Sequence, residues 1–119
     1  MNSQPPLILI VEDESDLADI YATWLKQKYR VRIANSGEEA IKKMDAEIDV
    51  MLVDRRMPDF SGDDVLEKAR ERQIDCHVSM VTAMRRELGT IETQIDDYLL
   101  KPVSRDTLIK TTENMLTAT

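Results

Sequence analysis

Short apolar runs alternate with amphipathic segments along the whole chain, and this alternation limits the folds that are open to it. Residues 7–11 are all apolar, which is typical of a parallel strand buried on both faces and predicts a strand at 7–12. The next stretch, about 15–28, repeats its apolar residues every three to four positions and predicts a helix. Strict alternation of such elements favours a parallel sheet with helices on both faces. We therefore predict an α/β chain of the doubly wound type.

Five strands and five helices are predicted in this way. The strands are expected at residues 7–12, 29–34, 48–53, 78–82 and 97–100. The helices are expected at about 15–28, from Ser36 to Met44, from Ser61 to Ala69, near 85–94 and from Ser104 to Leu116. A serine begins three of these helices, where its side chain can cap free backbone N–H groups. A strand order of 2-1-3-4-5 would place the first and third strands side by side.

Polar side chains follow or end four of the predicted strands. Glu12 ends the first strand and Asp13 follows it, and Asp54 follows the third strand. Thr82 ends the fourth strand, and Lys101 follows the fifth. The carboxyl ends of parallel strands share one edge of the sheet, where open α/β folds bind ligands. An isolated strand-end aspartate most often caps a turn, but here the neighbouring acids favour a single site.

The charges at this edge indicate what the site could hold. The carboxylates of Glu12, Asp13 and Asp54 repel one another unless a cation lies between them. Their formal charge of −3 is cancelled by +1 from Lys101 and +2 from a divalent ion. Carboxylate oxygens favour Mg²⁺, and the single histidine and single cysteine argue against a structural zinc site. The sequence therefore predicts an acidic, Mg²⁺-binding pocket in which Asp54 can be phosphorylated.

Composition narrows the remaining classes. The chain has 119 residues, enough for one domain with its own core. Its net charge of −7 weighs against binding nucleic acid or an anionic membrane through the overall field. No apolar run approaches the ~20 residues of a membrane span. Cys76 is the single cysteine, so no internal disulfide can form and a reducing cytoplasm is the expected location.

Four motifs, in this order, resemble the receiver domain of two-component response regulators. They are Val11-Glu12-Asp13-Glu14, Asp54-Arg55-Arg56-Met57-Pro58 with Gly62, Val81-Thr82-Ala83, and Asp97-Tyr98-Leu99-Leu100-Lys101-Pro102. Each motif is weak alone, but together they are specific, and the resemblance covers residues 7 to about 117. The segments 55–58 and 101–105 are also similar to archaeal receivers that precede a HalX-type helical domain. The resemblance implies a flavodoxin-like fold and one receiver domain over residues 1–119, with any output domain outside this chain.

The resemblance implies a phosphoacceptor and a metal site. Asp54 is expected to take a phosphoryl group from a sensor histidine kinase or a phosphotransfer protein. Asp13, Asp54 and the main-chain carbonyl of Arg56 are expected to ligate Mg²⁺ directly. Glu12 stands where the family usually has an aspartate, and it is expected to hold a metal-bound water. Such a domain is a signal transducer that assists its own phosphorylation and dephosphorylation, and is not counted as an enzyme.

The resemblance also implies a switch. Thr82 and Lys101 are expected to engage the phosphoryl oxygens, and the Tyr98 rotamer is expected to follow Thr82. The Lys101–Pro102 peptide is expected to be cis. The change would control an output domain or a partner, and a homodimer stays open. Neither nucleic acid nor a membrane is an expected direct partner.

Two departures from the family pattern affect these expectations. The segment from Thr82 to Tyr98 is a few residues shorter than the resemblance implies, and Ile95-Asp96 precedes the aromatic residue in place of Gly-Ala. The fourth helix, and any dimer through the fourth and fifth helices, are therefore in doubt. The second departure is Arg56, a bulky cation two residues after the phosphoacceptor, which either lies on the surface or tunes the acylphosphate lifetime.

Three other functions stay open from the sequence. A hydrolase with an aspartyl-phosphate intermediate resembles this chain, but it carries an acid two residues after the nucleophile, where Arg56 stands. A flavin- or nucleotide-binding module needs a loop after the first strand whose backbone amides bind the ligand's phosphate. Here that loop begins with Glu12-Asp13-Glu14, whose negative charges would repel a phosphate. A pseudo-receiver would bind partners without phosphorylation, and would not need the acids together with Thr82 and Lys101.

Overall fold

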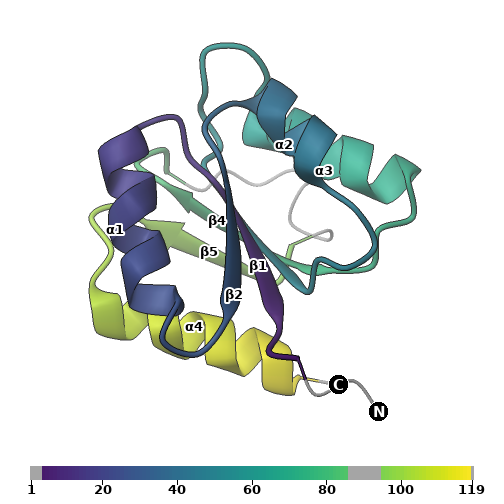
Figure 1. Ribbon diagram of the computed structural model, residues 1–119. Coiled ribbons are helices and arrows are strands. Elements are labelled where there is room, and N and C mark those ends of the chain that lie inside the picture. The colour runs from purple at the N-terminus through teal and green to yellow at the C-terminus, as the bar shows by residue number, and fades with distance from the viewer. Residues whose placement is uncertain (1–3, 86–94, 119) are drawn as a thin grey trace.

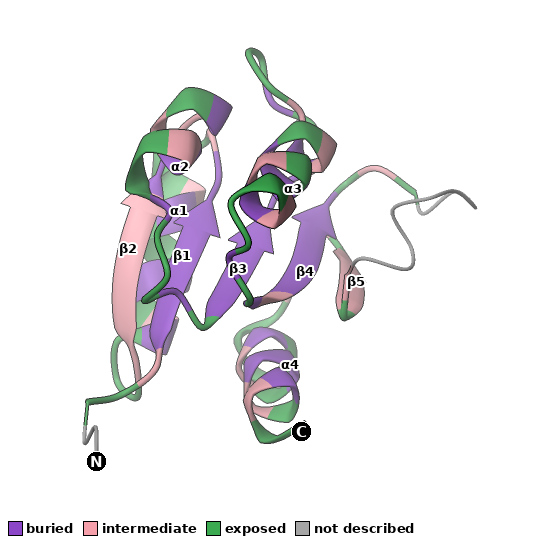
Figure 2. Ribbon diagram, turned by 90° about the vertical axis from the view of Figure 1, so that its right-hand side faces the viewer, coloured by how far each residue is buried: buried purple, intermediate pink, exposed green. Residues whose placement is uncertain are grey.

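A five-stranded parallel sheet forms the centre of the protein (Figure 1), and its strands lie in the order β2-β1-β3-β4-β5 (Figure 2). The computed structural model describes residues 4–85 and 95–118. The strands are β1 (Leu7–Val11), β2 (Arg30–Ala34), β3 (Val50–Val53), β4 (His77–Thr82) and β5 (Asp97–Leu100). The helices are α1 (Ser15–Leu25), α2 (Gly37–Lys43), α3 (Gly62–Glu71) and α4 (Arg105–Thr117). The predicted flavodoxin-like fold and its strand order are confirmed.

The apolar runs lie in the interior of the sheet. Every residue of β1 and β3 is buried, whereas most of β2, at one edge, is only half-buried. Alternate side chains of β1 enter two separate cores, with Leu9 on one side of the sheet and Ile8 and Ile10 on the other. Burial of one such side chain contributes roughly 1.5–3 kcal/mol. A central strand therefore has to be apolar on both faces, as the sequence predicts.

Among the residues that the structure describes, two helices cover each face of the sheet. Residues of α2 and α3 pack in the core that contains Leu9, and residues of α1 and α4 pack in the core that contains Ile8. Figure 2 shows α2 and α3 above the sheet and α4 below it, with the buried strands between the two layers. The loops that follow the strands are left at one edge, between the layers.

Serine side chains fix the starts of three helices. The hydroxyl groups of Ser36, Ser61 and Ser104 accept hydrogen bonds from the backbone N–H groups of Glu39, Asp64 and Thr107. At Ser61 the bond is reciprocal, because the Asp64 carboxylate accepts the Ser61 N–H at 3.1 Å. Such a cap stabilises a helix by about 1 kcal/mol. The loop after β3 is thus held at the start of α3.

Some boundaries differ from the prediction. Helix α1 ends at Leu25 because the N–H groups of Lys28 and Tyr29 turn back to the Leu25 carbonyl and lead the chain into β2. Strand β3 begins at Val50 because the N–H of Ile48 closes a turn with Asp45. The predicted helix near 85–94 lies outside the described residues.

Two further features are one peptide bond and the length of the helices. The Lys101–Pro102 peptide is cis, as predicted. Within residues 4–85 and 95–118, none of the helices has both the length and the apolar character that a membrane crossing requires.

Candidate functional site

Parallel pairing brings the two acidic loops together. Val11 at the end of β1 lies opposite Val53 at the end of β3. The backbone N–H of Asp54 continues this ladder by donating to the Val11 carbonyl at 2.9 Å. Glu12 is held in the same way on the other side, by donating to the Ala34 carbonyl at 2.9 Å. The side chains that follow β1 and β3 are therefore adjacent at one edge of the sheet.

The three predicted acids form a cluster. Glu12, Asp13 and Asp54 each place a carboxylate oxygen so that all three atoms lie within 4.8 Å of one another. Glu12 is only 2% exposed and Asp54 only 7%, whereas Asp13 is half-buried. Burial raises the pKa of Glu12, and the hydrogen bond from Lys101 opposes that change. A cluster of hard oxygen donors suits Mg²⁺, so the donor set fits the predicted ion.

Lys101 lies between two of these acids. Its ammonium is 2.6 Å from Glu12 Oε1 and 2.8 Å from Asp54 Oδ2. Burial by itself would lower the pKa of Lys101, but the hydrogen bonds to Asp54 and Glu12 outweigh it and raise the pKa. Lys101 is fixed from the main chain as well, because its N–H donates to the Thr82 carbonyl at 2.8 Å. The ammonium is thus a charged partner of the predicted phosphoacceptor.

A cavity of about 570 Å³ opens in front of Asp54. Its lining comes from the loops after β1, β3, β4 and β5, and consists of Asp13, Glu14, Asp54, Arg56, Met57, Pro58, Thr82, Ala83, Met84 and Lys101. The Asp54 carboxylate accepts the Arg56 N–H at 3.1 Å. Thr82 Oγ1 accepts the Met84 N–H at 3.2 Å, which fixes the hydroxyl at the cavity wall. The cavity therefore combines acids, an ammonium and a hydroxyl.

Tyr98 is linked to this site through the loop after β4. Its hydroxyl donates to the Met84 carbonyl at 2.6 Å. Because Met84 also bonds Thr82, the aromatic residue lies two hydrogen bonds away from the cavity wall. The structure thus brings the predicted acids, Lys101 and Thr82 together directly, and Tyr98 indirectly.

Arg55 is a residue that the sequence did not single out for a role. Its guanidinium forms a two-pronged pair with the Asp63 carboxylate, with Nε–Oδ1 at 2.9 Å and Nη2–Oδ2 at 3.2 Å. The remaining nitrogen, Nη1, lies 3.5 Å from the Tyr98 hydroxyl. The hydrogen bonds to Asp63 and Tyr98 raise the pKa of Arg55, so it stays charged. The spacing of Arg55 and Asp63 was visible in the sequence, but the contact of Arg55 with Tyr98 depends on the fold.

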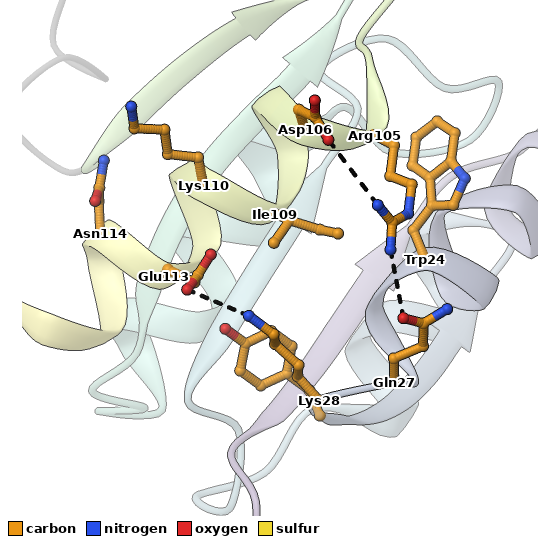
Figure 3. Close-up of a pocket in the computed structure, with 10 residues that line it drawn as sticks. Trp24, Gln27, Lys28, Arg105, Asp106, Ile109, Lys110, Glu113 and Asn114 are labelled. Carbon is orange, nitrogen blue, oxygen red and sulfur yellow. Dashed lines mark hydrogen bonds and ion pairs between the residues drawn. The ribbon is translucent and has the colours of Figure 1, made fainter.

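A second cavity, of about 500 Å³, lies between α1 and α4 (Figure 3). Trp24, which is partly buried, lines it and also packs against Tyr21 at a ring distance of 5.7 Å. Lys28 pairs with Glu113 at 3.4 Å across this groove. The acidic cluster belongs to the other cavity, so this groove is not the predicted metal site.

Known proteins resemble the whole folded core. A family model described as the response regulator receiver domain matches residues 8–113. A putative transcriptional regulator of Haloferax volcanii is 45% identical over 111 residues, which is 92% of this chain but 19% of that protein. The response regulator SaeR of Staphylococcus epidermidis is 37% identical over 113 residues, 92% of this chain and 49% of SaeR. This chain thus spans half or less of the length of these relatives.

A solved structure supports the same relationship. The response regulator protein TrrA from Thermotoga maritima, in complex with Mg²⁺-BeF, superposes with a TM-score of 0.80 at 28% sequence identity. The match covers 93% of this chain and 99% of that one. The likeness therefore extends over nearly the whole chain.

Proposed function

This chain belongs to the response regulator receiver domain family, and we propose that its Asp54 accepts a phosphoryl group from a phosphohistidine. The observation that carries the proposal is the setting of the Asp54 carboxylate, which lies 2.8 Å from the Lys101 ammonium and within the acidic cluster. Receiver domains are signal transducers that bind Mg²⁺ at an acidic pocket. The donor would be a sensor histidine kinase or a phosphotransfer protein.

The transfer is a displacement at phosphorus. A carboxylate oxygen of Asp54 attacks the phosphorus atom, the P–N bond breaks, and the imidazole nitrogen keeps the electron pair and takes up a proton. The product is an acylphosphate on Asp54. Phosphoryl transfer depends on positioning and charge stabilisation more than on covalent chemistry by the protein. Lys101 already bonds the nucleophile, so its ammonium is placed to balance charge on the incoming oxygens.

Mg²⁺ would be held by Asp13, Asp54 and the main-chain carbonyl of Arg56. When bound, the ion would neutralise charge on the phosphoryl oxygens. Glu12 would reach the ion through a water molecule. Its two carboxylate oxygens already accept hydrogen bonds, one from Lys101 at 2.6 Å and one from the Glu14 N–H at 3.1 Å. These bonds compete with direct ligation, which supports the indirect role.

The acylphosphate would then change the loop after β4. The Thr82 hydroxyl would donate to a phosphoryl oxygen. Because Thr82 Oγ1 now accepts a hydrogen bond from the Met84 N–H, movement of the hydroxyl would also move Met84. Tyr98 would follow, because its hydroxyl bonds the Met84 carbonyl. A change in population from 1:99 to 99:1 needs about 5.5 kcal/mol in favour of the active state. Thr82 and Lys101 are the residues that would supply the new bonds.

The signal would leave the domain through an output domain or a partner protein. The relatives of this chain are longer, since it spans 19% of one and 49% of the other. We assign residues 1–119 to one receiver domain that works in the cytoplasm, and we place any output domain outside this chain. The expected readout is therefore a change in a second protein unit, and not turnover of a small molecule.

Acetyl phosphate tests the proposal directly. The chain is incubated with acetyl phosphate and Mg²⁺, and its intact mass is measured. We expect the gain of one phosphoryl group, lost when EDTA removes the ion and lost in Asp54→Asn. Asp106→Asn is the matched control, because Asp106 is an exposed aspartate on α4. An unchanged mass in the wild type, or a gain that survives Asp54→Asn, would refute the assignment.

A further inference from the structure

Arg55 directly follows the phosphoacceptor, yet its side chain pairs with Asp63. The two-pronged pair with Asp63 joins the loop after β3 to the first turn of α3 at 2.9 and 3.2 Å. The Arg55 side chain is 13% exposed and that of Asp63 is 41% exposed, so the pair is open to water on the Asp63 side. A planar guanidinium held at two nitrogens has a fixed orientation. Its third nitrogen therefore points in one direction.

That third nitrogen meets the Tyr98 hydroxyl. Arg55 Nη1 lies 3.5 Å from the hydroxyl oxygen, which in turn donates to the Met84 carbonyl at 2.6 Å. The hydroxyl thus has an acceptor on one side and a cationic donor on the other. Two partners from different loops define the position of the ring more narrowly than one partner does.

We propose that Arg55, oriented by Asp63, is a positioning residue that holds the Tyr98 hydroxyl in its hydrogen bond to the Met84 carbonyl. The contact itself does not depend on phosphorylation. Its expected consequence, a shift in the equilibrium of the switch after phosphorylation, rests on the proposed function. The hydrogen bonds link Arg55 to the Met84 carbonyl through the Tyr98 hydroxyl, so the inferred effect passes through Tyr98. The path from α3 to the cavity wall is then Asp63, Arg55, Tyr98, Met84 and Thr82.

A different role is also consistent with the pair alone. Arg55 and Asp63 could simply stabilise the loop between β3 and α3, without any effect on Tyr98. The two roles differ in one respect. If Arg55 acts through the Tyr98 hydroxyl, substitution of Arg55 in a Tyr98→Phe chain, which lacks that hydroxyl, has no further effect on hydrogen exchange at Met84.

Amide exchange at Met84 measures this difference in the unphosphorylated chain. We expect Arg55→Met to speed hydrogen exchange of the Met84 N–H about threefold, or about 0.65 kcal/mol. The NMR signals of the Tyr98 ring should shift as well. In a Tyr98→Phe background, the same substitution should leave Met84 exchange unchanged. Equal acceleration in both backgrounds, or none in either, would overturn the proposal.

Two further variants separate the role of Asp63 from a general loss of an arginine–aspartate pair. Asp63→Asn keeps the size of the side chain but removes the charge that orients Arg55, and we expect the same shift of the Tyr98 signals as in Arg55→Met. Arg32→Met removes another arginine–aspartate pair, with Asp45 at 2.9 Å, from β2 at the far edge of the sheet. It should leave both readouts unchanged. A shift in Arg32→Met equal to that in Asp63→Asn would count against the proposal.

The outcome is separate from that of the acetyl phosphate experiment. Exchange and ring signals are measured without Mg²⁺ and without a phosphoryl donor. A failure of Asp54 to take up phosphate would therefore leave the role of Arg55 standing. Conversely, unchanged Met84 exchange in Arg55→Met would leave the phosphoacceptor assignment standing.

Discussion

The ammonium of Lys101 donates to the Asp54 carboxylate at 2.8 Å, although 47 residues separate the two in the sequence. Parallel pairing brings them together, because β3 and β5 both lie beside β4 and end at the same edge. The same ammonium bonds Glu12 at 2.6 Å. One cation therefore serves two buried carboxylates, and its removal should affect both folding and chemistry.

Lys101→Met tests this dependence. The substitution leaves Glu12 and Asp54 without their cation, and both are less than a tenth exposed. Loss of one partner from a buried pair typically costs 3–5 kcal/mol, and we expect the free energy of unfolding in urea to fall by about 3 kcal/mol. Phosphorylation by acetyl phosphate should slow about tenfold, or 1.4 kcal/mol in the barrier. Lys110→Met, at an exposed position of α4, is the control; equal effects in the two variants would contradict the role.

Gly62→Ala tests the packing of the loop behind Asp54. A Cβ at this position would lie 2.6 Å from the Asp54 carbonyl oxygen and 2.8 Å from Arg55 Cα, both main-chain atoms. The loop cannot relieve such contacts by rotating a side chain, so the backbone after β3 must move. We expect the free energy of unfolding to fall by about 2 kcal/mol. Glu67→Ala, exposed on the same helix, is the control.

The phosphorylation rate gives a second readout for Gly62→Ala. Movement of the loop displaces the Arg56 N–H, which now bonds the Asp54 carboxylate at 3.1 Å. Uptake of phosphate from acetyl phosphate should therefore slow even at temperatures where the variant is fully folded. Wild-type stability and rate in Gly62→Ala would show that the loop adapts without moving Asp54.

The sheet and the acidic cluster were predictable because they depend on local patterns and on one topological rule. The run from Leu7 to Val11 is apolar at every position, which indicates a strand buried on both faces. Once the strands are parallel and ordered, the acids after β1 and β3 must lie together. The cis Lys101–Pro102 peptide followed from the resemblance to receiver domains. These features need no knowledge of side-chain packing.

The features that were missed depend on tertiary contacts. Arg55 contacts Tyr98 across 43 residues of sequence, and no local pattern indicates which arginine of a pair will turn inward. Arg56 was considered instead, and it is exposed. The end of α1 was placed too late because Lys26-Gln27-Lys28 contains no glycine or proline that would mark a helix end, whereas in the structure the turn into β2 stops the helix at Leu25. Helix ends of this kind are set by the path to the next strand.

Asp59 should make stability depend on pH. Its carboxylate accepts the N–H groups of Glu38 at 2.9 Å and Gly37 at 3.1 Å, at the start of α2. The hydrogen bond from Glu38 is the main reason why the pKa of Asp59 is held below its ordinary value of 3.8. Because the folded pKa is lower than the unfolded pKa, this contribution is present above 3.8 and is lost as the pH falls through the lowered value.

Asp59→Asn removes this titration while keeping an oxygen acceptor. We expect the wild type to be more stable than the variant at about pH 7, and the difference to shrink as the pH is lowered to about 3. Urea unfolding at a series of pH values measures it. A difference between the two chains that stays constant over this range would mean that the Asp59 carboxylate contributes no charge-dependent stability.

Arg56→Ala should shorten the life of the acylphosphate. Arg56 and Met84 both line the cavity in front of Asp54, so we expect the Arg56 side chain to limit the approach of water to the phosphorus atom. We expect hydrolysis to be about threefold faster, or about 0.65 kcal/mol in the barrier. The decay is followed by intact mass after acetyl phosphate is removed, with Arg105→Ala on α4 as the control. An unchanged hydrolysis rate would make Arg56 a plain surface residue. Faster hydrolysis would mean that Arg56 lengthens the lifetime of the acylphosphate.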